Sequence, residues 1–419
     1  MVSPVHSSPA AAVNESSTAS RKRTSTQASF EDRYELQEEI GEGASARVYE
    51  AYDHVNGRQV AVKKSKNPQA MASMIRERGF LQKLTGDPHF VQILGFDSSE
   101  HEEAIVEELL PPDVCTAFAT KKISWPHLQR VYYDGFGALA SLKRQKIVHR
   151  DIKTDNFALC EDGQLRLFDF GLAKKVSEIS EFEFMQHRSL RPPEVVYQRP
   201  KINCSADIWS LGCMMFELAS GGKDLFEPKK MDCDSDADID LMTAYAVRRG
   251  RPPGVWTLQN EKAQKCFADK GELPAEPFKE WVCKEVQAQR PEVPKKQICE
   301  FAEALNHTVD YERIDAEDGQ KLPFFIHHDI FYDCTFEEGD ECLLHLWPAK
   351  EFLDEDNEIP ILQVDLAKCK PRSRHMIPQV KNNLFLVRIY FNAENTMDEI
   401  IEIPPRKALS FDGKVLKII

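Results

Sequence analysis

The most informative stretch of the chain reads HRDIKTDN at residues 149–156 and is followed by a DFG tripeptide at residues 169–171. This spacing supplies a carboxylate, Asp151, that can take the proton of an attacking hydroxyl group. Asn156 and Asp169 add an amide and a second carboxylate that can hold a divalent metal ion beside it. Lys153 can neutralise a phosphoryl group during transfer. Each tripeptide is a weak signal alone, but their order and separation together indicate phosphoryl-transfer chemistry.

Two segments upstream of these motifs have residues that could bind phosphate groups. Gly41 and Gly43, within IGEGASARV at residues 40–48, let the backbone approach phosphate oxygens and offer them N–H groups. A lone G-x-G would be read as a β-turn by default, but VAVK follows at residues 60–63, at the distance that a phosphate site needs. Lys63 ends this branched strand, where it can bind phosphates while it pairs with a carboxylate from a helix.

Glu77 is the predicted partner of Lys63. It lies in a segment whose apolar residues recur at helical spacing and whose packing side continues to Leu81 and Leu84. The competing acids fall on a later strand or on the hinge after it; they are Glu102, Glu103, Glu107 and Glu108.

The elements that must position these residues change character along the chain. Short β-like runs cover residues 34–40, 47–52, 58–64, 90–96 and 104–110, with a hairpin signal at Asn56-Gly57 and one helix after the third run. Beyond Pro111-Pro112 the pattern is helical, including a helix that opens at Ser124 and a buried one over residues 206–219. The sequence therefore predicts an α+β protein with a small five-stranded antiparallel β lobe and a larger helical lobe.

Domain boundaries follow from composition. Residues 1–30 are rich in Ser and Thr and predict a disordered tail, in which Arg21-Lys22-Arg23 is either a nuclear-import patch or a solvated basic trio. Residues 31–305 form the two-lobed unit, with lobes at 34–110 and 111–305. Residues 306–419 are predicted to be an extension of mixed, partly β character, either structural padding for the lower lobe or a docking unit for a partner.

Composition restricts the compartment and the partners. The net charge of −14 and the pI near 5.4 argue against bulk binding to nucleic acid and suit basic protein partners. Eleven scattered cysteines without a CxxC pair indicate reduced thiols in a cytoplasmic or nuclear protein. The longest apolar run, near residues 208–219, is too short to span a bilayer. We expect a monomer without membrane attachment.

The ordered motifs resemble those of eukaryotic protein kinases, and the resemblance covers the chain from about Tyr34 to residue 300. It implies ATP in a cleft between two lobes, with Mg²⁺ between nucleotide and protein. It implies that Asp151 accepts the hydroxyl proton and that Lys153 marks a Ser/Thr kinase. The implied catalytic set is Asp151, Lys153, Asn156, Lys63 and Glu77, with Asn156 and Asp169 as metal ligands. The implied nucleotide-binding set is Ile40, Gly41, Gly43, Val48, Ala61, Lys63, Glu108, Leu110 and Asp169.

A finer resemblance rests on QHRSLRPPEVV at residues 186–196 and on ADIWSLGCMMFELASGGKDLFEP at residues 206–228. Both are similar to the SR-protein kinases of the CMGC group, which implies substrates rich in Arg and Ser. The resemblance also implies that Asp207 braces the catalytic loop and that Glu194 pairs with a late arginine, for which Arg290 is the candidate.

Three departures from the kinase pattern keep a second function open. His187 stands seven residues before Glu194, where most Ser/Thr kinases place a hydroxyl that steadies the catalytic Asp and Lys. Ser45 replaces an aromatic residue at the tip of the glycine-rich loop. Glu107 stands at the back of the nucleotide site (the gatekeeper position), where a buried charge is unusual. The alternative to an active kinase is a nucleotide-binding pseudokinase that acts as a scaffold.

Two other constellations have weaker chemical content. Alternating aspartates at 232–240 imitate a calcium loop but lack the glycine and the final glutamate, which favours a solvated acidic loop. His327-His328 has no neighbours at metal-ligand spacing and is predicted to be a surface or strand pair.

Overall fold

The structure is a computed structural model, and it describes most of the chain up to residue 325 and the strands beyond it. The described residues are 29–118, 123–160, 164–180, 185–199, 202–227, 237–254, 256, 260–267, 276–325, 327–332, 343–348, 362–366, 373–377, 384–392, 395–403, 409–411 and 416–418. The predicted tail lies outside them except for Ser29 and Phe30, which begin helix α1 (Phe30–Arg33). The basic trio at residues 21–23 and most of the acidic loop at 232–240 also lie outside them.

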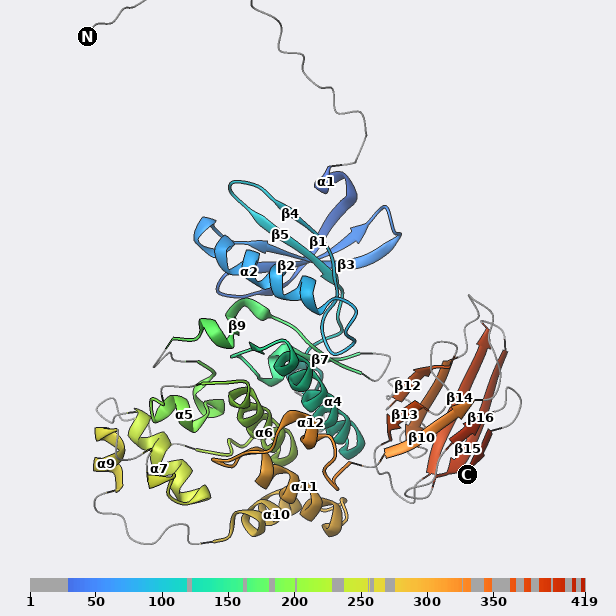
Figure 1. Cartoon of the computed structure of the whole chain (residues 1–419). Coiled ribbons are helices and arrows are strands. Elements are labelled where there is room, and N and C mark those ends of the chain that lie inside the picture. Colours follow the sequence, from blue (N-terminus) through green and yellow to red (C-terminus); the bar gives the residue numbers. More distant parts are fainter. Residues whose placement is uncertain are drawn as a thin grey trace, which may run out of the picture.

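The first lobe is a five-stranded antiparallel sheet in the order β1-β2-β3-β5-β4 (Figure 1). Its strands are β1 (Tyr34–Glu42), β2 (Ala46–Asp53), β3 (Arg58–Ser65), β4 (Ile93–Ser98) and β5 (Glu103–Glu108). The predicted turn between β2 and β3 is present, with Gly57 at a φ of 66° where a side chain would be strained. The prediction of five antiparallel strands is confirmed.

Strand register sorts the side chains of this sheet onto two faces. Val60 and Val62 pack with Tyr34, Ala51 and Val106 in a small core on one face. Because neighbours alternate along a strand, Ala61 and Lys63 point to the other face, together with their cross-strand partners Glu107 and Ile105. The same alternation that builds the core of the lobe therefore places Lys63 on its functional face.

Helix α2 (Pro68–Leu84) begins with the side chain of Asn67 accepting from the Ala70 N–H and with Pro68 in the first turn. One face of the helix is buried, and it carries Met74, Leu81 and Leu84 together with the single carboxylate Glu77. The packing of α2 thus fixes the position of Glu77 along the sheet, opposite Lys63 on β3.

The second lobe is helical and surrounds α4 (Trp125–Arg144) and α6 (Ser205–Ser220). Ser124 caps α4 by accepting from the His127 N–H, as the sequence predicted. The other helices are α3 (Val114–Phe118), α5 (Pro193–Val196), α7 (Ala237–Arg249), α9 (Glu261–Phe267), α10 (Phe278–Gln289), α11 (Lys295–Thr308) and α12 (Ala316–Gly319). Short strands β6 (Ile147–Val148), β7 (Phe157–Leu159), β8 (Leu165–Leu167) and β9 (Lys174–Lys175) pair near the catalytic loop. None of the helices that the structure describes is long and apolar enough to cross a bilayer.

The core of the helical lobe continues past residue 305, where the sequence placed its end. Val309, Ala316, Phe324 and Phe325 are buried in the same cluster as α4 and α6. The Gln129 side chain also donates to the Phe324 carbonyl oxygen at 3.0 Å. The boundary was missed because this segment has one short helix and otherwise irregular backbone, which leaves no periodic pattern.

The described residues beyond 325 form two four-stranded sheets with a hydrophobic core of their own. One sheet contains β13 (Ser373–Met376), β10 (His327–Tyr332), β16 (Leu409–Phe411) and β17 (Leu416–Ile418). The other contains β12 (Leu362–Asp365), β11 (Leu343–Pro348), β14 (Leu384–Asn392) and β15 (Asn395–Glu402). Residues 384–391, which read LFLVRIYF, lie in the central strand β14, and His327-His328 lies in β10.

We predict opposite effects for two Gly→Ala substitutions in helices. In Gly212→Ala the new methyl carbon would meet Val309 Cγ1 at 2.5 Å, so the variant should lose about 1–3 kcal/mol of unfolding free energy. In Gly79→Ala nothing lies within 4 Å of the new carbon, so better helix propensity should add about 0.5–1 kcal/mol. Urea denaturation of both variants measures this, and equal signs would contradict the packing of α6 against α11.

Candidate active site

Lys63 on β3 joins three separate elements. Its Nζ lies 2.7 Å from Glu77 Oε1 on α2 and 3.0 Å from Asp169 Oδ1. The two carboxylates raise the pKa of Lys63 against the opposing effect of burial, so the ammonium stays charged. Lys63 also holds the pKa of Asp169 below its ordinary value. The structure therefore brings together three residues that are far apart in the sequence.

Three of the four competing acids have other partners. Glu102 pairs with Lys64 at 2.7 Å, Glu103 with Arg78 at 2.8 Å and Glu108 with Arg166 at 3.3 Å. Glu77 also accepts from the Phe170 N–H at 3.2 Å, which ties helix α2 to the DFG segment. The selection of Glu77 on helical spacing agrees with this geometry.

The DFG segment is held by a buried aromatic ring. Phe170 is fully buried, and its ring packs edge-on against two other rings. The distance between ring centroids is 4.8 Å to His149 and 5.8 Å to Phe90. Asp169 has a φ of 61°, a left-handed conformation that turns the chain between the strand before it and the Phe170 anchor. This turn directs the Asp169 carboxylate to Lys63 while Phe170 packs into the core.

The catalytic loop groups Asp151, Lys153 and Asn156. Lys153 Nζ lies 3.1 Å from Asp151 Oδ2. The Asn156 amide nitrogen donates to the Asp151 carbonyl oxygen at 2.7 Å and to Asp151 Oδ2 at 3.0 Å. Because its nitrogen is used by the loop, the amide oxygen of Asn156 is the atom that could bind a metal.

Asp207 at the start of α6 accepts from the backbone of this loop. Its Oδ2 accepts from the His149 N–H at 2.6 Å and its Oδ1 from the Arg150 N–H at 3.0 Å. The carboxyl group is 1% exposed, and burial raises its pKa while His149 and the two amides oppose that rise. The predicted brace is present, and it fixes the backbone on the N-terminal side of Asp151.

The glycine-rich segment is the hairpin between β1 and β2, where Gly41 pairs with Val48. Neither Gly41 nor Gly43 has a positive φ, and a Cβ at either would meet nothing closer than 3.8 Å. The fold itself therefore does not require these glycines. The Gly43 N–H donates to the Ala46 carbonyl oxygen at 2.9 Å, so in this conformation it belongs to the hairpin.

The other predicted nucleotide contacts lie on the same lobe. Ala61 is buried on β3, and Ile40 on β1 is 47% exposed. Glu108 ends β5, with its N–H donating to the Gln92 carbonyl oxygen at 2.9 Å and its carboxylate engaged by Gln92 and Arg166. A bond from adenine to Glu108 would therefore fall to its carbonyl oxygen. Leu110, two residues later, is half-buried against the main core.

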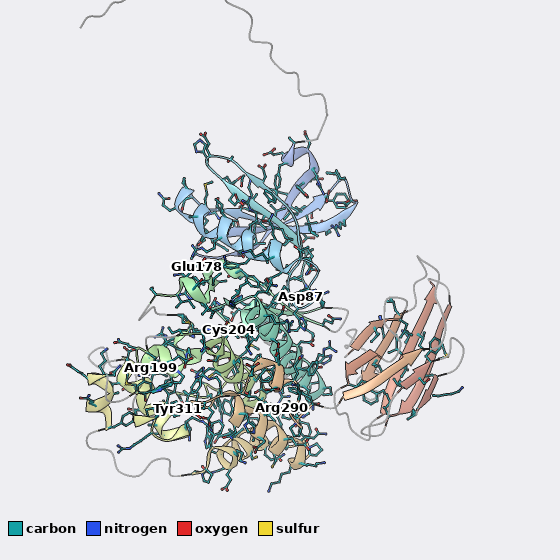
Figure 2. The ribbon with its side chains drawn as sticks, in the orientation of Figure 1. Asp87, Glu178, Arg199, Cys204, Arg290 and Tyr311 are labelled. Atoms are coloured by element: carbon teal, nitrogen blue, oxygen red, sulfur yellow. The ribbon has the colours of Figure 1, made fainter. Side chains whose placement is uncertain are left out.

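The predicted partner of Glu194 was wrong. Glu194 forms a two-pronged ion pair with Arg313, with both N–O distances at 2.8 Å. Arg290 instead donates to the carbonyl oxygens of Ile123, Leu218 and Ala219 in the helical lobe (Figure 2). Arg290 follows the end of α10, and its guanidinium is occupied by Ile123 and by open carbonyl groups in the last turn of α6. Arg313 lies beyond the end that the sequence set for the domain.

Sequence reasoning missed Gln186, whose buried side chain contacts both Asp207 and the catalytic loop. It missed Arg166 for a similar reason, because pairing with Glu108 across two distant strands leaves no local pattern. His187, which the sequence singled out, is exposed, and its Nδ1 lies 3.2 Å from Ser189 Oγ. A polar residue at position 186, next to the conspicuous His187, was the only available signal.

Glu107 lies on the same face of β5 as Ile105, and its buried Oε1 has no hydrogen-bond partner among the residues described. Burial raises the pKa of Glu107 to about 8, with Glu77 and Asp169 adding to the rise and Lys63 opposing it. The carboxyl group is therefore largely protonated at neutral pH.

The described residues contain no group of three His, Cys, Asp or Glu arranged to hold a metal ion. This does not conflict with the predicted Mg²⁺ site, because Mg²⁺ takes one or two carboxylates and completes its shell with phosphate and water. Asp169 and the Asn156 oxygen match that donor set.

Glu107→Gln should remove a pH dependence of stability. Between the ordinary carboxyl pKa and about 8, folding takes up a proton at Glu107, so the unfolding free energy of the native protein falls as pH rises. The advantage of the variant over the native protein should therefore grow from pH 5 to pH 8, by up to about 1.4 kcal/mol per unit. Denaturant titrations at several pH values test this, with the exposed Glu317→Gln as control. Parallel pH profiles would contradict a protonated Glu107.

Residues 34–325 match the protein kinase domain family. The chain is 28% identical over 211 residues to mitogen-activated protein kinase mpkB of Aspergillus fumigatus, covering 47% of this chain and 59% of the relative. It is 28% identical over 202 residues to extracellular signal-regulated kinase 1 of Candida albicans, covering 45% and 49%. It is 31% identical over 238 residues to mitogen-activated protein kinase 2 of Pneumocystis carinii, covering 52% and 68%. The chain spans about three fifths of the length of the first of these relatives and about half of the length of the second. With the family match over most of its length and the Lys63, Asp151 and Asp169 clusters in place, the chain belongs to the protein kinase domain family.

Proposed function

We propose that this protein is a Ser/Thr protein kinase that transfers the γ-phosphoryl group of ATP to protein hydroxyl groups. The observation that carries the proposal is the double contact of Lys63 with Glu77 and Asp169. It aligns the phosphate-binding lysine of one lobe with the metal-binding aspartate of the other lobe. Relatives named as mitogen-activated protein kinases support the same reaction.

The residues of the site divide the work of phosphoryl transfer. Asp151 accepts the proton of the substrate hydroxyl group, and Lys153, 3.1 Å from it, neutralises charge on the group in transfer. Bound Mg²⁺ would neutralise phosphate charge, and Asn156 and Asp169 are the residues that would hold it. The contribution of the protein is mainly positioning and electrostatic stabilisation.

The nucleotide site would be built from the strands of the first lobe. Gly41 and Gly43 have no side chains to cover the backbone, and their own packing gives no reason for glycine, which favours a role toward phosphate. Ile40, Val48, Ala61 and Leu110 would contact the adenine, with backbone groups at Glu108 and Leu110 as hydrogen-bonding partners.

Basic substrates, including Arg/Ser-rich ones, are the finer part of the proposal. Burial raises the pKa of Glu217, and the nearby carboxylates Asp224 and Asp155 add to that rise. Asp155 lies four residues after Asp151. Three carboxylates therefore share one region beside the catalytic loop, and the overall charge of −14 adds a long-range field. Together they favour a substrate with arginines near the accepting residue. The similarity of residues 186–196 and 206–228 to SR-protein kinases points the same way.

The alternative, a pseudokinase scaffold, is not favoured. Its strongest support was His187, but that imidazole is exposed and does not contact the catalytic loop. Lys153 and Asn156 both contact the Asp151 carboxylate.

Asp151→Asn should lower kcat by roughly 10² to 10⁴, the usual contribution of a positioned general base, or about 3–5 kcal/mol in the barrier. The amide keeps the size of the side chain, so nucleotide-dependent thermal shifts should persist. Radiolabelled phosphate transfer to a basic protein measures the rate. Asp318→Asn, an exposed carboxylate on α12, is the control and should keep native turnover. Native turnover in Asp151→Asn would remove this residue from the mechanism.

Glu217→Gln and Asp224→Asn should each raise KM for an Arg-rich peptide by roughly fivefold, the equivalent of about 1 kcal/mol, with kcat little changed. KM for a matched peptide with Ala in place of Arg should not move. Added salt should raise KM more for the native protein than for the variants, because the attraction is screened. Equal KM changes for both peptides would argue against a basic-substrate site.

A further inference from the structure

Gln186 is the most constrained polar residue near the catalytic loop that the phosphoryl-transfer mechanism leaves unused. It is 7% exposed and has a φ of 67°, a left-handed conformation that glutamine rarely adopts. Its N–H donates to the Arg150 carbonyl oxygen at 3.0 Å, and its own carbonyl oxygen accepts from Arg191 at 3.4 Å. Surrounding bonds therefore hold the backbone of Gln186 in an unfavourable conformation on both sides.

The Gln186 side chain joins the Ile152 N–H to the Asp207 carboxylate. Its Oε1 accepts from the Ile152 N–H at 3.0 Å, and its Nε2 donates to Asp207 Oδ1 at 2.8 Å. Only this orientation of the amide satisfies both partners, because an N–H must meet an oxygen and a carboxylate must meet a donor. The left-handed backbone and the length of the side chain together allow both bonds.

Asp151 is consequently fixed on both sides. Asp207 accepts from the backbone N–H groups of His149 and Arg150, the two residues before Asp151. Gln186 accepts from the amide that directly follows it, that of Ile152, which is fully buried. Without Gln186 the Ile152 N–H would be a buried donor without a partner. The backbone on either side of Asp151 is thus tied to the same carboxylate, directly at His149 and Arg150 and through Gln186 at Ile152.

The neighbouring His187 shows that the brace is specific to position 186. Its imidazole is exposed and contacts Ser189 rather than the catalytic loop. Residues 186–191 therefore contact the loop around Asp151 through Gln186 and not through His187, the residue that the sequence singled out.

We infer that Gln186 is a positioning residue that holds the Asp151 carboxylate in its productive orientation by joining the Ile152 amide to Asp207. The inference rests on the proposed kinase function, because it assigns Gln186 a role in the same reaction. It also makes the conformation of the segment that contains Gln186 a determinant of the geometry at Asp151.

The test compares Gln186→Gly with Gln198→Gly. Both remove a glutamine side chain at a positive φ, where glycine is not strained, but Gln198 has a φ of 54° and an exposed side chain. We expect Gln186→Gly to lower kcat by roughly tenfold to a hundredfold, with KM for ATP within about twofold, because misplacement affects the chemical step. Gln198→Gly should keep native kcat.

Hydrogen exchange of the peptide covering residues 149–157 gives a second readout that needs no activity. Its amides should exchange faster in Gln186→Gly and at the native rate in Gln198→Gly. If Gln186→Gly does not fold, Gln186→Asn repeats the comparison, since Asn tolerates a positive φ but is one carbon shorter.

The possible results distinguish the positioning role of Gln186 from the proposed kinase function. Unchanged kcat in a variant with faster exchange would make Gln186 merely structural and overturn the positioning role. Unchanged exchange would overturn the brace itself. A native protein that transfers no phosphate but loses loop protection in Gln186→Gly would overturn the proposed kinase function and leave the brace intact.

Discussion

The organisation of the active site depends on one buried carboxylate, Asp207. Burial of an ionised carboxylate costs several kcal/mol unless it is paired or hydrogen-bonded, and its ionised form here is stabilised by two backbone amides and the Gln186 amide. Each hydrogen bond to a charged group contributes about 1.5–3 kcal/mol, so the bonds can offset the cost only together. Loss of one therefore leaves part of the cost of burying Asp207 uncompensated. The catalytic loop and the segment at residue 186 consequently behave as a single unit on α6.

Lys63 plays the corresponding part between the lobes. Its contacts link the sheet, helix α2 and the DFG segment, and the buried Phe170 ring fixes the distance among them. The two networks approach each other at His149, which follows β6 and packs against Phe170 while its N–H donates to Asp207. A displacement of Phe170 would therefore disturb both Asp169 and the loop that carries Asp151. Packing and electrostatics are coupled at this one ring.

Sequence reasoning found the chemistry because the reactive groups lie in short motifs. HRDIKTDN, DFG and VAVK each place their groups within a few residues, and strand alternation with helical spacing then selected Glu77. The supports were harder to predict. Arg313 pairs with Glu194 across 119 positions and Arg166 pairs with Glu108 across two strands, so neither contact leaves a local pattern. The end of the helical lobe was missed for the same reason, because Phe324 and Phe325 are buried by tertiary packing and not by periodic structure.

Gln186 and Glu107 each hold an unfavourable local state beside the site. At residue 186 the cost is compensated, since a strained backbone is stabilised by two side-chain hydrogen bonds to the unit that holds Asp151. At residue 107 it is not, since one carboxyl oxygen is buried without a partner in the described structure. Protonation lowers the cost of that burial but leaves a neutral carboxylic acid beside Lys63, Glu77 and Asp169. The ionic balance of that face is therefore set by the protonation of Glu107 as well as by the Lys63 ion pairs.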